Sequence, residues 1–187
     1  MSNIEPIILD PADEIIVEAG VKYATKCATY IVGMTTRWLE YNWDCLTESS
    51  RTRIKAVIEK EVERRETTPD LSTLTDIDTP DWVRLNDFTS KPVTPLSNVR
   101  LELDSEDEFI IVSAVRQAHH LDETETDHIF TWTADHWDLF TKKTRDILIN
   151  DAQLELSLRA SERDMKLPDP ETLDSWEHLL DLYELGS

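Results

Sequence analysis

The sequence predicts an all-α protein, a tandem duplication of a unit of roughly four helices packed about a pseudo-two-fold axis. The segment WLEYNWDCLTESSR, which starts at Trp38, returns as WTADHWDLFTKKTR from Trp132, at an offset of 132 − 38 = 94 residues. All six tryptophans pair at this offset: Trp38 with Trp132, Trp43 with Trp137, and Trp82 with Trp176. Glycine is scarce, with 3 in 187 residues, which favours helices over Gly-rich turns.

The repeat divides the chain into a first helical unit, 1–93, and a second, 94–187, which form either two units or one compact domain. Residues kept in both halves are expected to hold the shared fold, and residues found in one half are free to specialise. We therefore expect structural roles for the residues that recur at the offset, namely Trp38, Trp43, Asp44, Thr47, Arg51 and Trp82, with Trp132, Trp137, Asp138, Thr141, Arg145 and Trp176.

Four helices are expected in each half. The first starts near 11 and near 105, because Asp10 and Asp104 are good N-caps followed by acidic residues that favour a helix N-terminus. The second carries the tryptophan pair over about 29–45 and about 125–140, with Thr124 as the expected N-cap of the later one. Thr47 and Thr141 are expected to cap the third helix, and loss of such a cap costs about 1 kcal/mol.

The third helix is expected to bury its aliphatic residues, which in the second half are Ile147, Leu148, Leu154, Leu156 and Leu158. After a connector at 67–80, a short helix opens at Pro80 with Thr79 as its cap, and its counterpart is a longer helix over 171–185. No stretch alternates convincingly with period two, and the apolar run 109–112 is assigned to a helix, so no strand is expected.

The composition indicates a strongly acidic protein. The formal net charge is −20, with 11 bases and 17 acids in 1–93 and 8 bases and 22 acids in 94–187. Such a chain repels nucleic acids and anionic membranes and associates quickly with basic surfaces. Glycine-rich phosphate loops, a signal peptide and a membrane-spanning run are not found, and the two cysteines are expected to be reduced thiols in a cytoplasm.

Carboxylates in the second half are the candidate partner-binding residues. Rows of carboxylates on helices can imitate the charge spacing of a DNA backbone and compete for a DNA-binding groove. A solvated acidic face without such a role is the alternative. The candidate contact residues are Asp104, Glu106, Asp107, Glu108, Asp122, Glu123, Glu125 and Asp127.

Histidines in the same region offer a different chemistry. Four of the five histidines lie between 119 and 136 among carboxylates, a mixture that suits zinc, manganese or iron. The candidate metal ligands are His119, His120, Asp127 and His128. Adjacent histidines on a helix point in different directions, and an acidic loop followed by a charged helical turn accounts for the same residues.

Part of the first half resembles a known group of proteins. The run Ala19-Gly20-Val21-Lys22-Tyr23-Ala24, followed by Thr29-Tyr30-Ile31-Val32 and Trp43, resembles small uncharacterised helical proteins of bacteriophages and their hosts over about 50 residues. In the second half the counterpart of Thr29–Val32 is Glu123-Thr124-Glu125-Thr126. The resemblance implies a phage or mobile-element origin, and it implies no catalytic residue.

These observations favour a non-enzymatic acidic binding protein. We expect it to be phage-encoded, to act in the host cytoplasm without a cofactor, and to inhibit or modulate a host or defence protein through its carboxylates. The expected partner is a protein with a basic, nucleic-acid-binding surface, and the chain itself is expected to be a monomer or a homodimer. A metal-dependent hydrolase and a structural or assembly protein are the alternatives.

Overall fold

The computed structural model is mostly helical and describes residues 6–27, 29–67, 79–93, 100–118, 120–161 and 171–185. The elements of the first half are β1 (Ile7–Leu9), α1 (Ile15–Ala24), α2 (Thr29–Asn42), the 3-10 turn η1 (Trp43–Cys45), α3 (Glu48–Thr67) and α5 (Thr79–Thr89). Those of the second half are β2 (Leu101–Leu103), α6 (Phe109–Ala118), α7 (Glu123–Asp135), η2 (Trp137–Leu139), α8 (Lys142–Ser161) and α9 (Glu171–Leu185).

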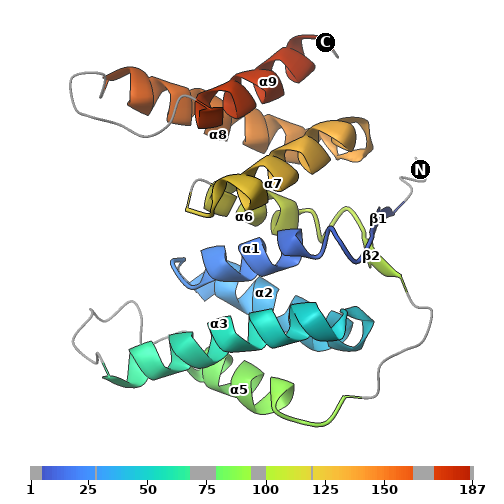
Figure 1. Cartoon of the computed structure of the whole chain (residues 1–187), viewed down its shortest axis with the longest axis vertical. Helices are drawn as coiled ribbons and strands as arrows, with labels where there is room; N and C mark the ends of the chain where they lie inside the picture. The colour runs from blue at the N-terminus through green and yellow to red at the C-terminus, as the bar shows by residue number, and fades with distance from the viewer. Residues whose placement is uncertain are drawn as a thin grey trace.

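The two halves present the same order of elements. β1 and β2, α1 and α6, α2 and α7, η1 and η2, and α3 and α8 each start 94 residues apart, as in 101 − 7 and 142 − 48. The last helix differs, since α9 starts earlier than the offset requires and is longer than α5. The helices stack along the long axis of the molecule, with those of the second half above those of the first (Figure 1).

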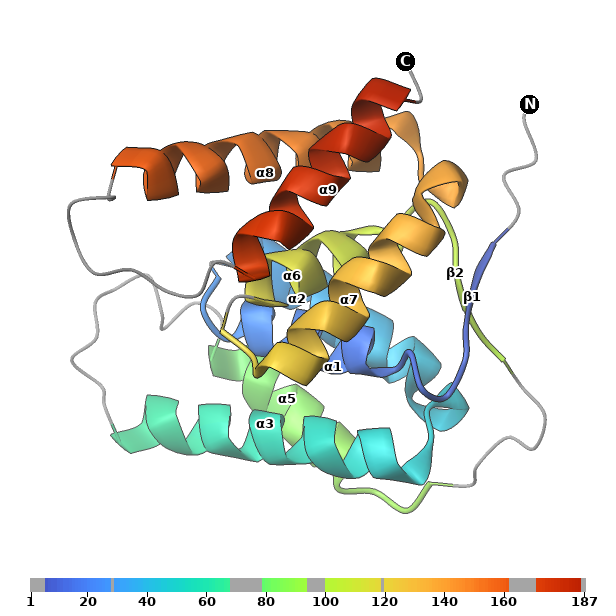
Figure 2. The same cartoon turned by 45° about the horizontal axis from the view of Figure 1, so that its top comes forward.

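The halves meet through matching elements. α1 packs on α6 more extensively than any other pair of elements in the described parts of the chain, and both views place these helices at the centre of the stack (Figures 1 and 2). A Cβ atom on Gly20 would lie 3.2 Å from the carbonyl oxygen of Ile110, so this glycine allows the two helices to approach closely.

A short antiparallel sheet joins the halves as well, and it corrects the expectation that no strand is present. Ile7 pairs with Leu103, Ile8 with Glu102, and Leu9 with Leu101. The outer residues of each strand are buried and the middle one is exposed. Because Ile8 and Glu102 occupy corresponding positions, the pairing is symmetric about its centre, as in a contact between two copies of one surface.

All six tryptophans are buried, none with more than 5% of its surface exposed, as their predicted structural role requires. Phe130 packs edge-on against Trp176 with ring centroids 5.0 Å apart. The predicted core of the third helix is partly wrong. Leu148 is fully buried, whereas Leu154 and Leu158 are 60% and 48% exposed.

The beginnings of the helices differ from the prediction at two places. Turns occupy 11–14 and 105–108, so that α1 and α6 start at Ile15 and Phe109 rather than near 11 and 105. Asp122, not Thr124, caps α7, since its side chain accepts a hydrogen bond from the backbone N–H of Glu125. Both residue types are good caps, but the backbone carbonyl of Asp122 already accepts a helical hydrogen bond from the N–H of Thr126.

The second helix of each half ends earlier than predicted, because α2 ends at Asn42 and α7 at Asp135, and the 3-10 turns η1 and η2 then carry Trp43 and Trp137. The other predicted helices are present. α5 contains Thr79 and Pro80 in its first turn, α9 spans the predicted 171–185, and 109–112 is helical. The part of the connector over 68–78 lies outside the described residues. None of the helices, over the ranges that the structure describes, is long and apolar enough to cross a membrane.

Candidate functional site

A buried glutamate fixes the start of the third helix in each half. The Glu14 carboxylate accepts hydrogen bonds from the backbone N–H and hydroxyl of Thr47, at 3.1 and 2.7 Å. Glu108 accepts the same two bonds from Thr141, at 3.0 and 2.6 Å. Both carboxylates are nearly inaccessible, with 3% and 2% of the residue exposed.

The two threonines act as the predicted N-caps. The Thr47 hydroxyl accepts a hydrogen bond from the backbone N–H of Ser50, and the Thr141 hydroxyl accepts one from that of Thr144, each at 3.2 Å. Each glutamate therefore binds a threonine that caps a helix, and the glutamate itself lies outside that helix. This arrangement links α1 to α3 and α6 to α8.

The position of Glu108 corrects one of the candidate contact residues. The sequence predicts partner binding for Glu108 as for its acidic neighbours, but its carboxylate is buried and satisfied by Thr141. An external partner cannot reach it without opening the contact between α6 and α8. Glu108 is therefore a structural residue.

The other seven candidate carboxylates reach solvent to different degrees. Asp107 and Glu125 are half-buried, and the exposed ones are Asp104, Glu106, Asp122, Glu123 and Asp127. Asp104 and Asp122 also have local roles, because each accepts hydrogen bonds from the backbone of the turn or helix that follows. Glu106, Glu123 and Asp127 are thus the exposed acids that can be changed with least effect on the fold.

Asp107 is half-buried, whereas Asp104 and Glu106 are exposed. Burial raises the pKa of the Asp107 carboxyl, an effect opposed by its hydrogen bond to the Asp104 backbone and reinforced by the charge of the Asp104 carboxylate. Its counterpart in the first half, Asp13, contacts Nε2 of His128 across the interface between the halves, at 3.0 Å.

The histidines do not assemble into a metal site in the described part of the chain, which holds no group of three His, Cys, Asp or Glu residues that could bind a metal ion. His128 is engaged with Asp13, and Asp127 is exposed. His120 is exposed too, and burial together with the charge of Lys26 lowers its pKa. His119 lies outside the described residues.

The recurring Asp residues lie within η1 and η2, and the recurring Arg residues lie in the first turns of α3 and α8. Asp44 and Asp138 are exposed, Arg51 is buried, and Arg145 is half-buried. The Arg51 guanidinium donates a hydrogen bond to the backbone carbonyl of Leu46, which ties the first turn of α3 to the preceding loop. This contact gives Arg51 the structural role that its recurrence predicts.

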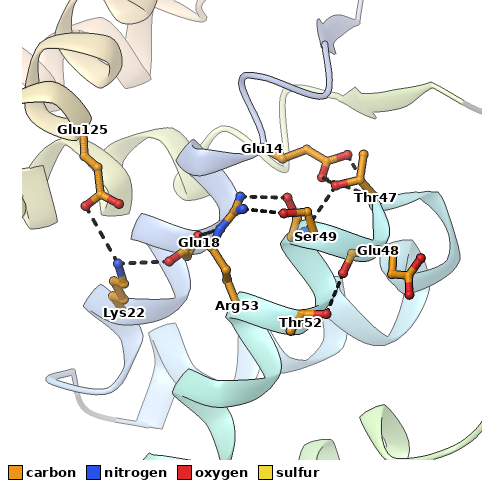
Figure 3. A network of polar contacts seen from close by, with 10 residues as sticks. Glu14, Glu18, Lys22, Thr47, Glu48, Ser49, Thr52, Arg53 and Glu125 are labelled. Carbon is orange, nitrogen blue, oxygen red and sulfur yellow. Dashed lines mark hydrogen bonds and ion pairs between the residues drawn. The ribbon is translucent and has the colours of Figure 1, made fainter.

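A polar network on one side of the molecule was not predicted. Arg53 donates to Glu18 at 2.5 Å and to the hydroxyl of Ser49 at 2.7 Å (Figure 3). Lys22 lies 3.0 Å from Glu18 and 4.0 Å from Glu125 of the second half. The sequence does contain a sign of this network, because both members of the Glu18–Arg53 pair are replaced in the second half, by Val112 and Ile147.

The corresponding place in the second half is a groove, which we call the α2–α6–α8 groove. Its volume is about 480 Å³, and it is lined by Tyr30, Ile31, Met34, Ser105, Glu106, Glu108, Phe109, Val112, Ser113, Arg116, Lys143, Thr144 and Ile147. Arg116 forms a bidentate ion pair with Asp151, in which two guanidinium nitrogens donate to the two carboxylate oxygens at 2.7 and 3.1 Å. Apolar side chains from α2, α6 and α8 thus share the lining of the groove with polar and charged ones.

The two cysteines are free and half-buried. Burial raises the pKa of both the Cys27 and the Cys45 thiol, and the charge of Asp44 raises that of Cys45 further. Since the thiolate is the reactive form, both should react slowly near neutral pH. We expect the rate of reaction with Ellman's reagent to keep rising above about pH 9. A plateau below about pH 8 in the Cys27→Ser or the Cys45→Ser variant would contradict this for the cysteine that remains.

Comparison with known proteins adds no relative. No family model, no curated protein and no solved structure matches the chain.

Proposed function

We propose that this chain is a non-enzymatic acidic binding protein, phage-encoded and active in the host cytoplasm, that inhibits or modulates a host or defence protein. The observation that carries the proposal is the set of exposed carboxylates in the second half, Asp104, Glu106, Asp122, Glu123 and Asp127. They belong to the half whose formal charge is −14, from 8 bases and 22 acids. A surface of this charge attracts a basic, nucleic-acid-binding protein surface at long range.

The proposal includes a tandem duplication, with each half descending from one protomer of a homodimer. The shared order of elements, the symmetric pairing of β1 with β2, and the paired Glu14–Thr47 and Glu108–Thr141 contacts support it. On this view, contacts present in both halves belong to the ancestral fold. Some acids of the second half, such as Glu106 and Glu123, have no acidic counterpart in the first half and so are not part of this shared fold. We propose that these acids serve partner binding.

Charge reversal tests the binding surface. The partner would be recovered by pull-down from host lysate and identified by mass spectrometry, and its affinity then measured with purified proteins. Changing Glu106, Glu123 and Asp127 together to lysine should weaken binding at least about tenfold, because three favourable charge interactions become repulsive. These positions avoid the cap Asp122 and the buried Glu108.

A matched control variant distinguishes the effect of where the acids lie from the effect of the overall net charge. Glu63, Glu66 and Asp87 are exposed acids of the first half, and changing all three to lysine alters the net charge by the same amount. This control should keep most of the affinity. Equal weakening by both triple variants would show that overall charge, rather than the second-half surface, governs binding, and unchanged affinity in the first variant would remove the proposal.

A further inference from the structure

One side of α8 carries aliphatic residues where α3 carries bases. Arg53, Lys60 and Arg64 of α3 correspond, at the offset of 94, to Ile147, Leu154 and Leu158 of α8. Spacings of seven and four residues place these three on one side of the helix. Leu154 and Leu158 are 60% and 48% exposed, so the later part of this side of α8 reaches solvent, whereas Ile147 is half-buried and packs against the core.

The α2–α6–α8 groove continues this apolar side. Ile147 lines the groove together with Ile31 from the first half and Val112 from α6. In the corresponding place around α1, the positions of these three residues are taken by Arg53, Glu125 and Glu18, whose charges are joined through the network drawn in Figure 3. Three linked charged side chains on one side of the molecule are thus replaced by three aliphatic side chains at the matching positions on the other side.

The charge of this face differs from that of the whole chain. The charged residues that line the groove are two acids, Glu106 and Glu108, and two bases, Arg116 and Lys143. Glu108 is buried against Thr141, and Arg116 is paired with Asp151. Over the full sequence, 39 acids stand against 19 bases. The groove is therefore close to neutral on a molecule that is otherwise strongly negative.

The near-neutral charge of the groove indicates which kind of molecule binds there. A basic partner gains little charge complementarity at a balanced surface, whereas two copies of a chain with a net charge of −20 repel each other least where that charge is absent. Tyr30, at the edge of the groove, is 75% exposed, and tyrosine is enriched in protein interfaces. An exposed ring beside a hollow can fill the same hollow of a second molecule when a two-fold axis relates them.

We propose that the dimer face, which consists of the α2–α6–α8 groove with Leu154 and Leu158, binds the dimer face of a second copy of the chain. The product is a homodimer with a two-fold axis. Its interface is separate from the contact of α1 with α6, which is already made within each chain. Of the three acids changed in the charge-reversal test, Glu106 lines the groove, whereas Glu123 and Asp127 do not.

Sedimentation velocity over a range of protein concentrations tests the dimer. The unmodified protein should approach twice its mass of 21.7 kDa as the concentration rises. The double variant Leu154→Lys/Leu158→Arg introduces the residues found at the matching positions of α3, and both are good helix formers. It should stay monomeric, with a dissociation constant raised at least about tenfold.

A control and a second measurement complete the test. Leu139 is 43% exposed on η2, outside the dimer face, so Leu139→Lys should leave the dimer unchanged. Added salt should strengthen the dimer by screening the net charge, whereas it should weaken a complex with a basic partner. An unmodified protein that stays monomeric up to about 1 mM, or a dimer that the double variant retains, would overturn the proposal. The variant Glu123→Lys/Asp127→Lys, which changes no residue of the dimer face, keeps the charge-reversal result separate from this test.

Discussion

Replacing Glu108 by alanine is expected to lower the free energy of unfolding by about 2–3 kcal/mol. The Glu108 carboxylate accepts bonds from the backbone N–H and the hydroxyl of Thr141, and it is 2% exposed. Its removal leaves the N–H at the start of α8 without its partner and opens a space between α6 and α8. Hydrogen bonds to a charged acceptor stabilise more than neutral ones, and an unpaired buried donor adds to the loss.

Urea denaturation followed by circular dichroism measures this loss. Glu108→Gln keeps an acceptor of similar shape and should lose only about 1 kcal/mol. Glu106→Ala, two residues away and exposed, should change stability by less than about 0.5 kcal/mol. Glu14→Ala should behave like Glu108→Ala, because Glu14 makes the matching bonds to Thr47. A loss in Glu108→Ala no larger than in Glu106→Ala would contradict the structural role.

Replacing Trp82 by alanine is expected to cost about 3–5 kcal/mol. Trp82 is fully buried on α5, which packs on α3, and the guanidinium carbon of Arg65 lies 5.9 Å from the centre of its ring. Alanine removes the whole indole from the core and leaves a cavity that the surrounding helices fill only in part. Such a loss is a large fraction of the about 5–15 kcal/mol that stabilises a typical protein.

The same denaturation experiment compares three variants. Trp82→Phe keeps an aromatic ring and should lose clearly less than Trp82→Ala. Val83→Ala, at an exposed neighbour, should lose less than about 0.5 kcal/mol. A Trp82→Ala protein as stable as Val83→Ala would show that α5 does not depend on this indole for its packing on α3.

The repeat in the sequence predicted the parts of the fold that both halves share. The tryptophans and the capping residues Thr47 and Thr141 recur at one offset, and the structure buries the former and gives the latter their predicted hydrogen bonds. The same logic, applied to Glu108, would have identified it as structural, because its counterpart is Glu14. Its place in an acidic run favours partner binding instead, since such a run does not reveal which carboxylate is buried.

Other features had no sufficient signal in the sequence. β1 and β2 are three residues each, too short for alternation to be recognised. Asp122 and Thr124 are both acceptable helix caps by residue type, so the sequence alone does not choose between them. Leu154 and Leu158 have the spacing of core residues, and their exposure follows from which side of α8 faces its neighbours.

The candidate binding surface was predicted only in outline. The acidic segment itself is evident from composition, but the sequence does not separate Glu123, which is exposed, from Glu125, which faces Lys22. The groove was missed because its lining comes from both halves. Ile31 and Val112 are distant in sequence, and only the fold brings them to one place.

The symmetric strand pair has a consequence for how the chain reaches its native state. Ile7 and Leu101 occupy matching positions and are 101 − 7 = 94 residues apart, so bringing β1 to β2 closes a very long loop. Loops of this length carry an entropic penalty that local helix pairs such as α6 with α7 avoid. Helix pairs within each half should therefore form early in refolding, and the meeting of α1 with α6 should set the rate of the last step.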